Sequence, residues 1–177
     1  MKFSSMLLIV TGGVAAYKAA DLARLAGKRG ARVTCALTDG AARFVTPMLF
    51  AALTGNPAYG ELFDLKNETE MGHIRLSREN DAILVAPATA DFISKAANGA
   101  ADDLASTILL AADKPVFFAP AMNPRMYAHP AVKRNLALLR GDGVRIISPA
   151  TGDVACGEHG EGRMAEPADI LNYMEQA

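Results

Sequence analysis

The chain of 177 residues has no tryptophan, two cysteines and no surplus of either charge. Two cysteines cannot form a disulfide framework, so a reducing, cytoplasmic location is expected. The 18 basic residues balance 19 acidic ones, which argues against a nucleic-acid partner. No apolar run is long enough to cross a membrane, and residues 1–10 lead straight into Gly12-Gly13 without a cleavage signal. We therefore expect no membrane association and read this segment as a buried strand.

Short apolar runs alternate with helical patterns along the whole sequence. Strands are predicted at residues 6–11, 32–38, 82–86, 115–119 and 144–148. Helices are predicted at residues 15–29, 41–53, 91–98, 102–112, 130–139 and 168–175, and residues 68–79 are read as a loop with a short helix. This alternation predicts an α/β fold, a single-domain Rossmann-like or flavodoxin-like parallel sheet with helices on both faces, over residues 1–177. Such sheets bind ligands beyond the carboxyl ends of their strands.

A glycine turn follows the first predicted strand. Gly12 and Gly13 open the next helix, where backbone N–H groups and the helix dipole favour a phosphate. The turn matches neither G-x-G-x-x-G nor the P-loop pattern, so neither a dinucleotide nor a nucleoside triphosphate is indicated. A tight strand–helix turn without a ligand explains the glycines equally well. Thr89 and Ser106, near other predicted helix starts, are either helix caps or ligand contacts.

Two stretches carry unusual side chains. Asn123 lies between two methionines in Pro120-Ala-Met-Asn-Pro-Arg-Met-Tyr127, and its amide can orient a carboxylate by hydrogen bonds. Cys156 lies in a glycine-rich segment, residues 151–164, that we read as a mobile flap, and its thiol can supply a proton. Turn stabilisation by the asparagine and an inert thiol are the alternatives.

The histidines give weaker signals. His73 is either an ordinary surface or core residue or a catalytic one. Cys156 and His159 form C-x-x-H, but a zinc site needs three or four protein ligands, and only His73 and Cys35 are plausible additions. No metal site is therefore predicted.

Four ordered motifs resemble a known family, the homo-oligomeric flavin-containing cysteine decarboxylases, and the resemblance as a whole runs from about residue 6 to residue 170. They are the glycine start Gly12–Lys18, the H-I-x-L segment at His73, P-x-M-N-x-x-M-[WY] at Pro120–Tyr127, and A-C-G-x-x-G-x-G-x-M at Ala155–Met164. Within the family, the sequence is most similar to the phosphopantothenoylcysteine decarboxylases of coenzyme A biosynthesis. It departs from the family pattern at Arg75, where many relatives carry Glu, and at Asp91, where some carry Asn.

The resemblance implies an FMN-dependent decarboxylase (a carboxy-lyase) that converts 4'-phosphopantothenoylcysteine to 4'-phosphopantetheine through thioaldehyde and enethiol intermediates. It implies catalytic roles for His73, Asn123 and Cys156. The implied FMN contacts are Gly12, Gly13, Val14, Thr38, Phe44, Thr89, Ala90, Asp91, Ser106 and Ala121. The implied substrate contacts are Asn123, Met126, Ala155, Gly157 and Met164.

The resemblance also implies partners. The family forms homotrimers, often four of them in a dodecamer, with the flavin at contacts between subunits, and in many bacteria the decarboxylase is fused to a phosphopantothenoylcysteine synthetase. Three alternatives stay open: a peptidyl-cysteine decarboxylase of a ribosomal peptide pathway, a non-catalytic flavin-binding regulatory subunit, and a plain nucleotide-binding module. Cys156 argues against the first, because those relatives lack the flap thiol. The three retained catalytic residues argue against the second, and the third predicts a colourless protein.

Overall fold

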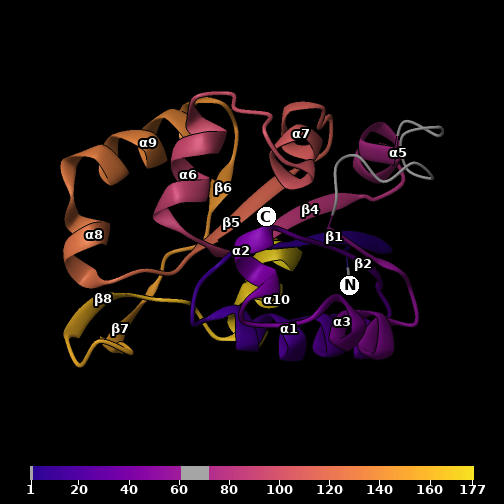
Figure 1. Cartoon of the computed structure of the whole chain (residues 1–177), viewed down its shortest axis with the longest axis horizontal. Coiled ribbons are helices and arrows are strands. Elements are labelled where there is room, and N and C mark those ends of the chain that lie inside the picture. Colours follow the sequence, from indigo (N-terminus) through magenta and orange to yellow (C-terminus); the bar gives the residue numbers. More distant parts are fainter. Residues whose placement is uncertain (1, 61–71) are drawn as a thin grey trace.

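A six-stranded parallel sheet forms the centre of the computed structural model, which describes residues 2–60 and 72–177 (Figure 1). The strand order is β3-β2-β1-β4-β5-β6, with every neighbouring pair parallel. The strands are β1 (Ser5–Val10), β2 (Arg32–Leu37), β3 (Ala58–Tyr59), β4 (Ala82–Ala88), β5 (Val116–Pro120) and β6 (Arg145–Ile146). The order reverses at β1 and β4, so the switch point where such sheets bind ligands lies between these strands.

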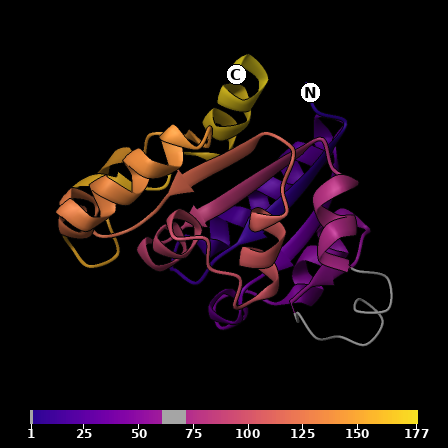
Figure 2. The same ribbon diagram turned by 90° about the horizontal axis from the view of Figure 1, so that it is seen from above.

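Helices cover both faces of the sheet (Figures 1 and 2). One face carries α1 (Ala16–Lys28), α3 (Pro47–Thr54) and α10 (Pro167–Gln176), and the other carries α5 (Gly72–Arg78), α6 (Ala90–Ala97), α7 (Leu104–Leu110) and α9 (Pro130–Gly141). The predicted Rossmann-like α/β fold is therefore confirmed. In the described part of the chain, no helix is both long and apolar enough to span a membrane.

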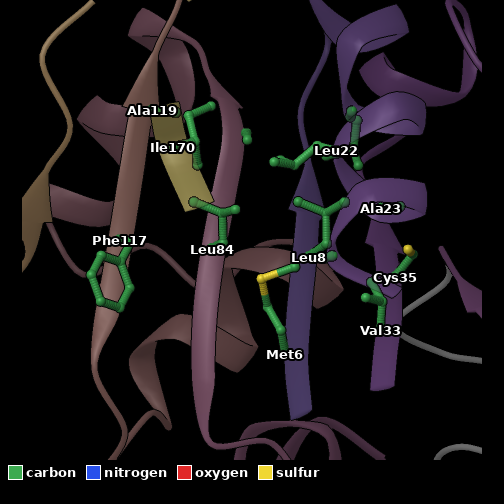
Figure 3. Close-up of a cluster of buried hydrophobic side chains, with 14 of the residues drawn as sticks. Met6, Leu8, Leu22, Ala23, Val33, Cys35, Leu84, Phe117, Ala119 and Ile170 are labelled. Atoms are coloured by element: carbon green, nitrogen blue, oxygen red, sulfur yellow. The ribbon is translucent and has the colours of Figure 1, made fainter. Parts of the chain in front are cut away.

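The strand residues divide between two hydrophobic cores because their side chains alternate across the sheet. Met6, Leu8 and Leu84 pack beneath α1, whose Leu22 and Ala23 face them (Figure 3). Leu7, Ile9, Ile83 and Val85 point the other way, toward α6, α7 and α9. Strands buried on both faces read as continuous apolar runs, which is why β1 and β4 are recognisable from sequence.

Four segments differ from the sequence prediction, and one of them is the short edge strand β3, which was not predicted. The helix predicted at residues 41–53 is divided into α2 (Asp39–Ala42) and α3, because Thr46 caps a new helix that begins at Pro47. Residues 124–128 form an additional short helix, α8 (Pro124–Ala128). The expected glycine-rich flap is an antiparallel hairpin of β7 (Ala150–Asp153) and β8 (His159–Arg163). The part of the 68–79 prediction before residue 72 lies outside the described residues.

Candidate functional site

A cavity of about 990 Å³ opens beyond the carboxyl ends of the central strands. Its wall is built from the turns that follow β1, β2, β4 and β5, together with the β7–β8 hairpin. A volume of this size is typical of a site for a drug-sized ligand or cofactor. The cavity lies where the strand order reverses, as expected for this architecture.

The glycine turn after β1 packs against the turn after β2. A Cβ atom on Gly12 would lie 2.7 Å from the backbone carbon of Gly40, so no larger residue fits there. Close packing of two turns thus accounts for Gly12 without a ligand. Gly13 has more room, since its Cβ would meet only the Thr89 methyl group, at 3.4 Å. The two glycines bring the β1 and β2 turns together at the cavity wall.

Threonine hydroxyls connect neighbouring turns at the floor of the cavity. The Thr11 hydroxyl donates to the Pro87 carbonyl oxygen at 2.7 Å and accepts from the Thr89 N–H at 3.3 Å. Thr38 and Thr89 cap their helices by accepting from the N–H groups of Ala41 and Phe92. Among the described residues, the Thr38 hydroxyl hydrogen has no acceptor. Thr38 can therefore donate to a ligand in the cavity.

The basic side chains in the wall are each bound to a carboxylate of this chain. Three basic and five acidic residues line the cavity. Lys18 and Arg163 each bind Glu166 Oε1 at 2.8 Å, and Lys95 binds Asp102 at 2.9 Å. The hydrogen bond from Lys18 holds the pKa of Glu166 below its usual range, and Asp102 raises the pKa of Lys95. An anionic ligand must therefore rely on neutral donors of the turns or on groups from outside this chain.

Asn123 and Cys156 meet in the cavity wall. Asn123 Oδ1 caps α8 by accepting from the Arg125 N–H at 2.8 Å. The Asn123 amide then points to the hairpin and donates to Cys156 Sγ at 3.0 Å. The thiol is exposed, whereas the only other cysteine, Cys35, is buried, and this burial raises its pKa to about 12. The structure thus joins the amide and the thiol that the sequence singles out separately.

Close packing holds the hairpin against the Asn123 loop. The Met122 N–H donates to the Gly162 carbonyl oxygen at 2.9 Å. A Cβ atom on Gly162 would lie 2.3 Å from the Met122 carbonyl oxygen, and one on Gly160 would lie 2.8 Å from Pro124 Cβ. These two glycines, which the sequence suggests as features of a mobile flap, are thus required by contact with the loop that carries Asn123.

Most of the predicted site residues line this one cavity. They are Gly12, Gly13, Val14, Thr38, Thr89, Ala90, Asp91, Ala121, Asn123, Met126, Ala155, Cys156 and Met164. Four are not in its wall. Phe44 is exposed, Ser106 is buried and bonds to Asp103 in the cap of α7, and Gly157 forms the tip of the hairpin. The fourth, His73, lies in α5, which both views place well away from the hairpin (Figures 1 and 2).

Sequence reasoning missed several residues of the wall, among them Tyr17, Lys18, Gly40, Lys95 and Arg163. Lys18 lies within a recognised motif, but its partner Glu166 is 148 positions away, and no local pattern reveals that pair. In the described ranges 2–60 and 72–177, no group of three or more His, Cys, Asp or Glu side chains could hold a metal ion.

Comparison with known proteins decides the family. The Flavoprotein family matches residues 1–177. The chain belongs to the flavoprotein family. It is 46% identical over 172 residues to the coenzyme A biosynthesis bifunctional protein CoaBC of Bacillus subtilis, a match that covers 97% of this chain and 42% of that protein. This flavoprotein chain therefore spans less than half the length of that bifunctional relative.

Two solved structures have the same fold. A PPC decarboxylase mutant in complex with pantothenoylaminoethenethiol is 31% identical, with a TM-score of 0.88 over 97% of this chain and 96% of that one. The FMN-dependent cysteine decarboxylase TvaF from thioviridamide biosynthesis is 34% identical, with a TM-score of 0.76 over 81% of this chain and 88% of that one. The recognised resemblance to flavin-containing cysteine decarboxylases is thus confirmed.

Proposed function

We propose that this flavoprotein binds FMN and decarboxylates 4'-phosphopantothenoylcysteine to 4'-phosphopantetheine in coenzyme A biosynthesis. The observation that carries the proposal is the pairing of the Asn123 amide with the Cys156 thiol, 3.0 Å apart in the wall of a cofactor-sized cavity. The similarity to CoaBC and to PPC decarboxylase supports the same substrate.

The cavity fits a flavin mononucleotide. The Thr38 hydroxyl, whose hydrogen has no acceptor within residues 2–60 and 72–177, and the backbone N–H groups of the Gly12–Gly13 turn are neutral donors for one phosphate group. Val14, Ala90 and Ala121 add apolar surface to the wall. One glycine turn offers one phosphate site, which favours FMN over a dinucleotide such as FAD. We propose that the following residues contact the cofactor: Gly12, Gly13, Val14, Thr38, Thr89, Ala90, Asp91 and Ala121.

When bound, a flavin would supply hydride-transfer chemistry at the carbon beside sulfur, which is the electron sink that a cysteine carboxylate otherwise lacks. The protein must orient the substrate so that the carboxylate leaves as CO₂. The Asn123 amide is the donor we assign to that carboxylate, because it faces the cavity and belongs to a loop fixed by Pro120 and Pro124. Met126, Ala155 and Met164 are proposed to line the substrate path, with Gly157 at the hairpin tip.

Loss of CO₂ leaves an enethiol that needs a proton at carbon. Cys156 is in direct contact with Asn123 and is the acid we assign to this step. His73 is proposed to act in the oxidative half. Because α5 does not contribute to this cavity, His73 must come from a neighbouring copy of the chain. We propose a homotrimer, alone or in a dodecamer, as in the family that the chain resembles. The exposed Phe44 is proposed to contact a neighbour's flavin in the same way. Ser106 is buried, and we propose that it acts on its own chain's cavity by holding Asp103 in the wall.

The relative from Bacillus subtilis is bifunctional and longer than this chain. We propose that residues 1–177 form one decarboxylase domain and that a phosphopantothenoylcysteine synthetase acts with it, fused or separate. The comparison with this relative supports only the pairing of the two activities.

The visible spectrum of the purified protein, followed by chromatography of the released flavin, tests the cofactor. We expect FMN, and finding FAD or no flavin would reject this part. Incubation with 4'-phosphopantothenoylcysteine tests the substrate, with 4'-phosphopantetheine as the expected product. A protein that acts only on a peptide with a C-terminal cysteine, and stops at the enethiol, would instead be a peptidyl-cysteine decarboxylase. A yellow protein without any decarboxylation would be a regulatory subunit.

A further inference from the structure

The two polar ends of the Asn123 side chain have different partners. Its carbonyl oxygen accepts from the Arg125 N–H at 2.8 Å, and a backbone N–H can only donate, so the orientation of the amide is fixed by this cap. The NH₂ group therefore faces Cys156 Sγ, at 3.0 Å. Without substrate, Cys156 Sγ therefore occupies the position beside the Asn123 amide that we assign to the substrate carboxylate.

We propose that the Asn123 NH₂ group serves two acceptors in turn, the substrate carboxylate before decarboxylation and the Cys156 sulfur after it. This inference rests on the proposed function and deepens it. Asn123 is then a substrate-binding residue in the oxidative half and a positioning residue for the acid in the reductive half.

The exchange follows from the charges involved. An ionised carboxylate is a much better hydrogen-bond acceptor than a neutral thiol, so an arriving substrate displaces the sulfur from the amide. When the carbon–carbon bond breaks, the carboxylate leaves as uncharged CO₂, and the amide loses its charged acceptor. The Cys156 thiol then returns to the fixed amide, and it reaches the reacting carbon only after CO₂ has gone.

The same contact assists proton transfer. Cys156 gives its S–H proton to one carbon of the enethiol, the S–H electron pair stays on sulfur as a thiolate, and the hydride supplied by the cofactor completes the other carbon. The negative charge thus develops on Sγ, where the Asn123 N–H already points. A donor placed in advance at a developing charge is an effective form of transition-state stabilisation.

Asn123→Asp is the decisive variant. A carboxylate oxygen still accepts from the Arg125 N–H and preserves the cap of α8, but the donor to sulfur is lost. Arg125→Gln is the matched control. It changes the net charge by the same amount on the same helix, from a side chain that is 89% exposed and only 3.9 Å from Glu158. Measurements at high salt screen the long-range electrostatic effect of both substitutions on Cys156.

The first measurement is alkylation of Cys156 by iodoacetamide, read by mass spectrometry on the parent and both variants. Cys35 is buried with a pKa raised to about 12, so it does not react at neutral pH. Asn123→Asp loses the hydrogen bond that stabilises the charge developing on Sγ, so the variant is expected to slow alkylation at least about tenfold. Arg125→Gln is expected to change it less than about twofold. Equal rates in the parent and Asn123→Asp would overturn the proposal.

The second measurement uses pantothenoylaminoethenethiol, which has no carboxylate, mixed anaerobically with chemically reduced holoprotein. Return of the oxidised-flavin absorbance reports enethiol reduction. We expect Asn123→Asp to slow this step at least about tenfold. If Asn123 served the carboxylate alone, the variant would reduce the probe at the parent rate, and the proposal would be wrong. A parent protein without flavin, or unable to reduce the probe, would instead reject the proposed function, and alkylation would then decide the contact by itself.

Discussion

Gly162→Ala tests whether close packing of the hairpin builds the site. In the parent, the Gly162 carbonyl oxygen accepts from the Met122 N–H at 2.9 Å, one residue before Asn123. A Cβ atom at this position would lie 2.3 Å from the Met122 carbonyl oxygen, and backbone atoms cannot give way as a flexible side chain does. The residue also has a φ of +152°, which L side chains rarely adopt. We therefore expect β8 to separate from the loop.

The expected cost has two parts. Loss of the Met122–Gly162 hydrogen bond is worth about 1 kcal/mol, and an alanine held at this φ is strained by about 1–3 kcal/mol. The free energy of unfolding should thus fall by about 2–4 kcal/mol. If the hairpin instead detaches from the Asn123 loop, the loss cannot exceed the free energy with which the hairpin packs on that loop. Either way, Asn123 and Cys156 move apart. A displacement of about 1 Å in an active site costs roughly 100-fold in rate, and we expect 4'-phosphopantetheine formation to fall by at least that factor.

Gly152→Ala is the control in the same hairpin. Its Cβ atom would approach only the flexible Arg163 side chain, at 3.5 Å. We expect its free energy of unfolding to stay within about 0.5 kcal/mol of the parent. Urea denaturation measures stability, and mass spectrometry of the product measures activity. Parent-like activity in Gly162→Ala would refute the argument that this contact positions the thiol.

Three further outcomes are expected. Cys156→Ser should consume substrate and accumulate the enethiol, two hydrogens lighter than 4'-phosphopantetheine by mass spectrometry, because general acid catalysis is worth about 10²–10⁴-fold; full product at the parent rate would exclude Cys156 as the acid. His73→Asn should abolish CO₂ release but retain bound FMN, and activity should return when it is mixed and reassembled with Cys156→Ser, since each neighbour then supplies the missing group; no recovery would contradict a shared site. Glu166→Gln should lower the free energy of unfolding by about 1–2 kcal/mol at pH 7. Because Lys18 lowers the pKa of Glu166 in the folded state, this difference should shrink as the pH falls from the ordinary pKa of glutamate, about 4.3, through the lower folded-state pKa; urea titrations that give the same difference at pH 7 and pH 3 would contradict it.

The sheet and the positions of the main helices could be predicted from sequence because each signal is local. β1 and β4 are short apolar runs that end at a glycine turn and near Pro87, and α1 ends before Gly30, whose φ is +90°. The break at Thr46 was also visible in principle, since a threonine before a proline is a common helix start. It was missed because the apolar pattern continues through residues 41–53.

The site was predictable residue by residue but not as an arrangement. The motifs identified Asn123 and Cys156, and nothing in their spacing indicated a direct contact across 33 positions. The glycines around Cys156 suggested mobility because glycine is usually chosen for backbone freedom. In the folded chain, Gly160 and Gly162 instead provide room for Pro124 and Met122, the neighbours of Asn123.

The glycines of the hairpin and the asparagine loop therefore form one unit that neither motif specifies alone. The family motif indicates a catalytic role for His73, but the structure places this residue in α5, outside the cavity that holds Asn123 and Cys156. Three basic residues of the wall are already bound to carboxylates of this chain, so an anionic substrate finds few free charges there. Within one chain, the anions of the proposed cofactor and substrate therefore meet mainly neutral donors such as Thr38 and Asn123, and the proposed role of His73 requires a second copy of the chain.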